Sequence, residues 1–162
     1  MSSDVRSVAN YVLDWASAQG RGVTNLEINK IVFFLHAHHL VELGTPLVSA
    51  KIEAWDYGPV FRELYSQFKS YENSPITDRA TKIDPESGTR VVCKETFGAS
   101  TQHLIESLLP KYVRLSASAL VSLSHEVGGP WDKVWNRNGG VNPSMKISDE
   151  SIRDWFAKTA RH

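Results

Sequence analysis

The chain has 162 residues, enough for one domain with a sizeable core, and 41% apolar and 22% charged residues are ordinary for a globular protein. Its 18 basic and 18 acidic side chains cancel, which argues against a nucleic-acid-binding protein. A single cysteine excludes an internal disulfide, and we see neither a secretory signal nor the roughly 20 consecutive apolar residues of a membrane span. We therefore expect a cytoplasmic protein without membrane contact.

The first third of the chain predicts two helices. Apolar residues at helical spacing begin at Val5, and Asp4 can cap this first helix. Thr24 and Glu27 form a Thr-x-x-Glu capping box, so a second helix should cover about residues 25–43. Its sequence IVFFLHAHHLV is apolar on most faces, which predicts a buried central helix.

The stretch KIEAWDYGPVFRELYSQFK, residues 51–69, gathers aromatic residues around one Gly-Pro pair. Its first part predicts a short strand near residues 51–55 or an irregular linker. Gly58 and Pro59 are expected to form a structural turn, with positive φ at Gly58 and a third helix that begins at Pro59. The stripe of that helix that we assign to the core consists of Phe61, Tyr65 and Phe68.

The rest of the chain predicts one hairpin and further helices. A loop over residues 72–80 precedes a β-hairpin near residues 81–93. Capping residues, prolines and apolar spacing predict four later helices, which start near Thr101, Ser116, Pro130 and Ser148. Pro110 is expected close to the end of the first of these helices, or to kink it. RNGGVNPSM, residues 137–145, is expected to be a loop. The predicted fold is mainly α: one domain over residues 1–162, a compact bundle of about six helices with a small β-hairpin.

Three histidines in the second helix are candidates for a metal site. His36, His39 and Glu42 recur at a spacing of three, and two histidines with one carboxylate can hold a metal. An H-E-x-x-H arrangement is absent, however, and the helix is strongly apolar. We therefore favour hydrogen-bonded histidines at the edge of a core, His38 included, and expect no metal, cofactor or catalytic residue.

Two further sites for chemistry are weaker. Ser124, His125 and Glu126 are catalytic residue types, but neighbours on a helix point about 100° apart, so these three should not face one substrate. His125 is expected to bond a carbonyl or to pack beside Trp131. Cys93 lies in a predicted strand without an adjacent helix N-terminus, so we interpret it as a small structural residue.

Trp55 and Tyr57 flank the predicted turn, and the residues leave their role open. Each side chain combines a large apolar surface with one polar group. Such side chains on a rigid turn suit the covering of a core and the gripping of a partner equally well.

Four blocks carry a resemblance to a known family: VANYVLDWA, TNLEINKIVFFLHAHHL, PLVSAKIEAWDYGPVFRELYSQFKSY and LSHEVGGPWDKVW. In order and spacing they resemble the SocA-like antitoxin family, also called the Panacea domain and once described as phage-associated proteins. The likeness is strongest over residues 5–135. It implies an α-rich domain that neutralises a toxin encoded beside it, by direct binding or as an adaptor that presents the toxin to an AAA+ protease. No catalytic residues come with the resemblance.

Because blocks shared among members with diverse partners are expected to build the scaffold, partner specificity should fall in the loop 72–80, the hairpin and the C-terminal tail. The candidate partner-binding residues are Trp55, Tyr57, Arg79, Lys82 and Arg90. Homo-oligomerisation stays open. The alternatives are a phage- or prophage-associated metal-dependent hydrolase using His36, His39 and Glu42, and a DNA-binding autoregulator.

Overall fold

The computed structural model describes residues 2–136 and 145–159, and these confirm a mainly α fold. They form seven α-helices, where the pattern predicts about six, and two small antiparallel sheets of two strands each. The helices are α1 (Val5–Ala18), α2 (Asn25–Glu42), α3 (Arg62–Phe68), the 3-10 helix η1 (Lys69–Tyr71), α4 (Ala99–Val113), α5 (Ala117–Ser124), α6 (Pro130–Trp135) and α7 (Asp149–Thr159). The strands are β1 (Ile52–Trp55), β2 (Gly58–Phe61), β3 (Thr81–Ile83) and β4 (Arg90–Val92).

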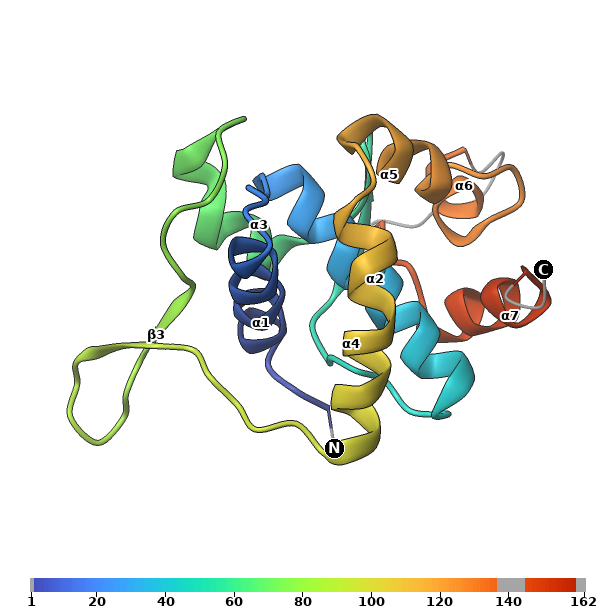
Figure 1. Ribbon diagram of the computed structural model, residues 1–162. Helices are drawn as coiled ribbons and strands as arrows, with labels where there is room; N and C mark the ends of the chain where they lie inside the picture. Colours follow the sequence, from blue (N-terminus) through green and yellow to red (C-terminus); the bar gives the residue numbers. More distant parts are fainter. Residues whose placement is uncertain (1, 137–144, 160–162) are drawn as a thin grey trace.

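Helix α2 is the centre of the fold and contacts α1, α3, α4, α5, α7 and β2 (Figure 1). It begins at the predicted capping box, since Thr24 Oγ1 accepts from the Glu27 amide and the Glu27 carboxylate accepts from the Thr24 amide. Because neighbours cover nearly every side of α2, its apolar residues show no single buried face, as the sequence predicts. The caps at Asp4 and Ser116 are also confirmed.

Pro59 does not begin a helix, so that prediction is wrong. It lies in β2, which pairs with β1 in the register Ile52↔Phe61, and α3 begins only at Arg62. A proline is accepted in a strand where its missing N–H would face away from the paired neighbour. Pro110 lies inside α4, three residues before the helix ends at Val113, which agrees with the expected place close to the helix end.

Neither edge of the β1–β2 sheet is left unpaired. On the β1 side, the Ala54 amide donates to the Met145 carbonyl and the Ile147 amide donates to the Ile52 carbonyl. On the β2 side, side chains of α2 replace a third strand. Asn29 Oδ1 accepts from the Phe61 amide at 2.9 Å, and Lys30 Nζ donates to the Pro59 carbonyl at 3.0 Å. The sheet is thereby fixed to the central helix.

The predicted hairpin at residues 81–93 is confirmed, and it projects from the helical body as an arm (Figure 1). Its base is fixed by the buried Asn10 of α1. Asn10 Nδ2 donates to the carbonyls of Ala80 and Cys93, and Asn10 Oδ1 accepts from the Ala80 amide. We call the segment 81–92 the hairpin arm.

Two expectations lie wholly or partly outside the described residues: the loop over residues 137–145, of which only Met145 is described, and the end of the C-terminal tail after Thr159. In the described ranges, no helix has the length and apolar character to cross a membrane.

Candidate functional site

At the turn between β1 and β2, three polar side chains from α2 and the end of α5 meet: those of Lys30, Ser124 and His125. Gly58 has φ +112°, which confirms the positive φ predicted for it. A Cβ placed there would lie 2.6 Å from Lys30 Cε, 2.6 Å from Ser124 Oγ and 3.5 Å from His125 Nε2. We call this meeting point the Gly58 junction. Only a residue without a side chain fits it.

The end of α5 closes over the junction through an aromatic stack. The His125 ring lies on the Trp131 ring with centroids 3.7 Å apart and planes within 2°, which confirms the predicted packing. Trp131 Nε1 donates to the Trp55 carbonyl at 2.6 Å. Burial lowers the pKa of His125, and the charge of Lys30 lowers it further. The stack joins the LSHEVGGPW block to the turn.

The structure brings together Ser124 and His125, which sequence reasoning separated. Helix α5 ends at Ser124, so His125 leaves the helical path and both side chains approach Gly58. Glu126 is exposed, and no described contact brings it to this point. Ser124 Oγ donates to the Val121 carbonyl, so the hydroxyl forms no pair with His125 of the kind that activates a nucleophile.

The buried carboxylate of Glu53 holds the outer side of the turn. It accepts from Arg62 at 2.9 and 3.1 Å and from Trp55 Nε1 at 3.0 Å. The Arg62 hydrogen bonds are the main reason that the pKa of Glu53 falls to about 2. The Trp55 ring also contacts the Tyr65 ring edge-on at 4.9 Å. Trp55 is therefore part of the scaffold of the turn.

Replacing Glu53 by glutamine should lower the free energy of unfolding at pH 7 by about 1–2 kcal/mol, because the charge-assisted bonds to Arg62 are lost. The depressed pKa also means that Glu53 stabilises the fold fully above pH 4.5, and that this contribution is lost as the pH falls towards 2. Urea unfolding between pH 2 and 7 measures both effects. The exposed Glu126→Gln is the control, and an equal acid dependence in both variants would contradict the prediction.

The three histidines of α2 point to three different neighbours. His36 Nε2 contacts Asp149 Oδ1 at 2.8 Å, His38 Nε2 contacts the Tyr112 hydroxyl at 2.8 Å, and His39 bonds the Thr45 carbonyl and Thr101 Oγ1. Within the described part of the chain, no three metal-ligating side chains form a cluster. These contacts are those of histidines hydrogen-bonded within a core.

Cys93 is buried at the base of the hairpin arm, where its amide donates to the Ala80 carbonyl. Burial raises the pKa of its thiol. Both observations fit the structural role that the sequence suggests for Cys93.

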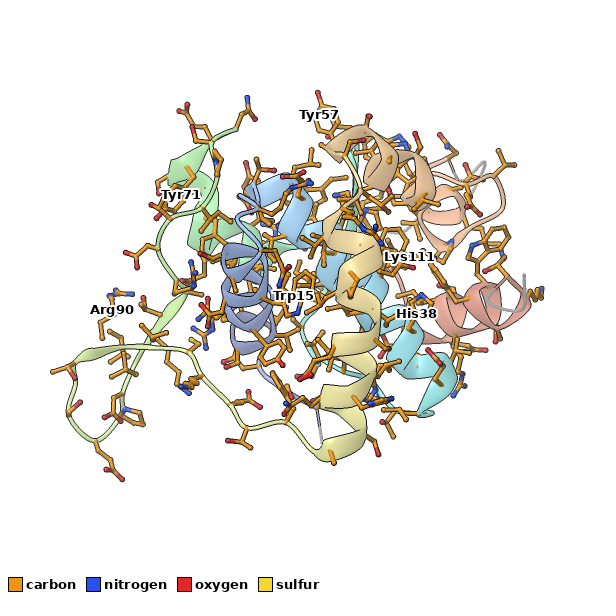
Figure 2. The ribbon with its side chains drawn as sticks, in the orientation of Figure 1. Trp15, His38, Tyr57, Tyr71, Arg90 and Lys111 are labelled. Carbon is orange, nitrogen blue, oxygen red and sulfur yellow. The ribbon has the colours of Figure 1, made fainter. Side chains whose placement is uncertain are left out.

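The candidate partner-binding residues separate into two kinds. Tyr57 is 62% exposed and points outward beside α5, and Arg90 extends from the hairpin arm (Figure 2). Lys82 lies on the arm and is half-buried. Arg79, by contrast, is held against α1 by an ion pair of 2.7 Å with Asp14. Arg79 and Trp55 thus have internal contacts, whereas Tyr57 and Arg90 reach into solvent.

Sequence reasoning also placed Tyr65 in the core, which is wrong. Phe61 and Phe68 are buried, but Tyr65 is 38% exposed, because it lies beside Trp55 at the open pocket rather than in the core. Two exposed apolar residues of the hairpin arm were missed, namely Ile83 at 55% and Val92 at 54%. The two-residue alternation of the strands puts both on one face, so the pattern contained the signal.

Comparison with known proteins assigns the family. The sequence model of a family described as "Antitoxin SocA-like, Panacea domain" matches residues 28–132. The chain belongs to this family. Antitoxin SocA from Caulobacter vibrioides (strain NA1000 / CB15N) is 38% identical over 156 residues, which cover 96% of this chain and 83% of that protein. No solved structure matches the chain.

The matched Panacea region runs from α2 into α6, so it contains the whole Gly58 junction and the hairpin arm. Sequence reasoning missed Lys30, whose side chain lies at that junction. Lys30 is the only lysine of α2 and stands directly before the apolar run Ile31–Leu35, and a lysine at such a position is the signal that would have found it.

Proposed function

We propose that this chain is an antitoxin that neutralises a toxin protein by binding it directly, and that the hairpin arm makes the contact. The relationship to Antitoxin SocA over almost the whole chain supports the antitoxin role. The observation that carries the choice of surface is the apolar face of the arm, where Ile83 and Val92 are more than half exposed. Exposed apolar side chains on a projecting element are typical of protein-binding surfaces.

The chemistry of the arm suits a protein partner. Arg90 lies on the same face as Ile83 and Val92, because Ile83 pairs with Arg90 and Thr81 with Val92. An apolar centre with an arginine at its side is a common composition of interface hot spots. The bonds of Asn10 hold the base of the arm in place, so less order has to be gained on binding.

The experiment begins with the neighbouring gene, whose product should be toxic alone and harmless when this chain is co-expressed. The affinity of the purified pair is then measured for wild type, Ile83→Asp, Val92→Asp and Arg90→Glu. Each change should weaken binding tenfold or more, because it introduces or reverses a charge at the interface. The melting temperature should stay nearly unchanged, since the three side chains have little packing to lose. Val127→Asp, at an apolar residue that is 88% exposed after α5, is the control.

Two outcomes would lead elsewhere. If the arm variants bind as wild type while Tyr57→Ala folds normally and loses binding, the recognition surface is the aromatic turn. If neutralisation in cells requires an AAA+ protease and purified toxin stays active in the complex, the chain acts as a protease adaptor rather than a direct inhibitor.

A further inference from the structure

A pocket of about 350 Å³ opens between the start of α2, the β1–β2 turn and α3, away from the hairpin arm. The residues that matter for its chemistry are Asn25, Asn29, Lys30, Trp55 and Tyr65. The volume lies at the small end of ligand pockets and suits a molecule the size of one or two amino acids.

Lys30 supplies a charge that the fold itself does not require. Its side chain is 1% exposed, and its ammonium donates one described hydrogen bond, to the Pro59 carbonyl. An ammonium has three N–H donors. Covering a strand edge needs no cation, because Asn29 bonds the neighbouring Phe61 amide with a neutral side chain. Burying a cation for one carbonyl is costly, so the position points to a further acceptor.

The surroundings of Lys30 leave that acceptor unsupplied within the described residues. Asp56 acts on Lys30 through its charge, but no carboxylate of the described chain forms an ion pair with it. The other charged or titratable groups nearby are His125 at the end of α5, and Lys69 and Glu72 at the rim of the pocket. Asp56 lines the pocket as well, so its two carboxylates, Asp56 and Glu72, are matched by two cations, Lys30 and Lys69, and the pocket as a whole does not repel an anion.

The amides in the pocket are already committed. Asn29 Nδ2 donates to the carbonyl and to Oδ1 of Asn25, and Asn25 Nδ2 donates to the Tyr65 carbonyl. These bonds hold the Asn25 and Asn29 side chains in the pocket wall. Lys30 is then the group that can select a ligand by its charge. Trp55 and Tyr65, in edge contact at 4.9 Å, add flat apolar surface above it.

We propose that this pocket binds a small organic carboxylate, whose oxygens accept hydrogen bonds from Lys30 Nζ while its apolar body lies against Trp55 and Tyr65. The inference is independent of toxin binding, because it rests on other elements and other residues than the hairpin arm. According to this proposal, the antitoxin binds a small-molecule ligand in addition to its protein partner.

The test compares two probes that differ in charge alone, N-acetyl-L-phenylalanine and its neutral C-terminal amide. Each is titrated into the full chain at pH 6, and binding is followed by the NMR signal of the Trp55 indole N–H. The acid should bind at least tenfold more tightly than the amide. Lys30→Met should abolish that preference, Lys94→Met, an exposed lysine outside the pocket, should retain it, and Tyr65→Ala should weaken both probes.

A second measurement does not depend on the Lys30 variant folding. In wild type, the acid should raise the pKa of Lys30, read from the NMR shift of its side chain, whereas the amide should leave it unchanged. Equal binding of acid and amide, or no binding of the acid up to about 10 mM, would overturn the proposal. So would signal changes confined to residues outside the pocket. None of these outcomes bears on neutralisation, which is measured separately.

Discussion

Gly58→Ala should lower the free energy of unfolding by about 2–4 kcal/mol. Two costs add at this position. An alanine is strained at φ +112°, and its Cβ would lie 2.6 Å from Lys30 Cε and from Ser124 Oγ. Side chains that already pack closely can move apart only by disturbing their own contacts. Urea unfolding at pH 7 measures the loss.

Gly88→Ala separates the two costs. Gly88 also has positive φ, +70°, but a Cβ there meets no atom within 4 Å. Gly88→Ala should lower the free energy of unfolding by only about 1–2 kcal/mol, which is the strain of an alanine in the left-handed conformation. Adding Ser124→Ala to Gly58→Ala should recover part of the loss, because one of the two close contacts is removed. If Gly58→Ala and Gly88→Ala are equally stable, the junction has room for a side chain and our description of it is wrong.

The second large effect is a rise in stability with pH. Burial lowers the pKa of Lys30 to about 7, from 10.5 for a free lysine. Below pH 7, both folded and unfolded chains bind the proton, and the folded chain has the full cost of the buried charge. Between pH 7 and 10.5 the unfolded chain keeps a proton that the folded chain has lost, so the free energy of unfolding increases with pH. From pH 7 to 9 the gain should be about 2 kcal/mol.

Lys30→Met tests the origin of this rise. The methionine has a similar length and no charge, so the gain between pH 7 and 9 should disappear, whereas the exposed Lys69→Met should retain it. The range ends at pH 9 because the raised pKa values of Cys93, Tyr11 and Tyr112 act in the opposite direction at higher pH. A wild-type stability that is constant over this range would mean that Lys30 stays charged in the folded protein.

Local signals in the sequence predicted the helices well. The capping box at Thr24, the caps at Asp4 and Ser116 and the hairpin near residues 81–93 all depend on neighbours in the chain, and all are confirmed. The error at Pro59 has a physical reason. A proline suits both the first turn of a helix and a strand edge, and only the pairing with β1 decides between them.

The site depended on contacts that no local pattern contains. Lys30, Gly58 and Ser124 are separated by 28 and 66 positions, and their meeting follows from the way α2 and α5 pack on β2. Tyr57 and Trp55 could not be told apart in sequence, although one is a solvent-exposed side chain and the other is tied to Glu53. Burial of a particular side chain is a property of the tertiary structure.

The hydrogen bonds of Asn10 have a consequence for how freely the sequence of the hairpin arm can change. One side chain of α1 fixes the two ends of the arm, at Ala80 and Cys93, through bonds to main-chain atoms alone. Hydrogen bonds to main-chain atoms do not depend on which side chains the arm carries between Ala80 and Cys93. Mutations within residues 81–92, including insertions at the tip, can therefore accumulate without disturbing the core. Related proteins can therefore differ in the whole of this short segment, and a protein designer can replace it with a different loop joined at Ala80 and Cys93.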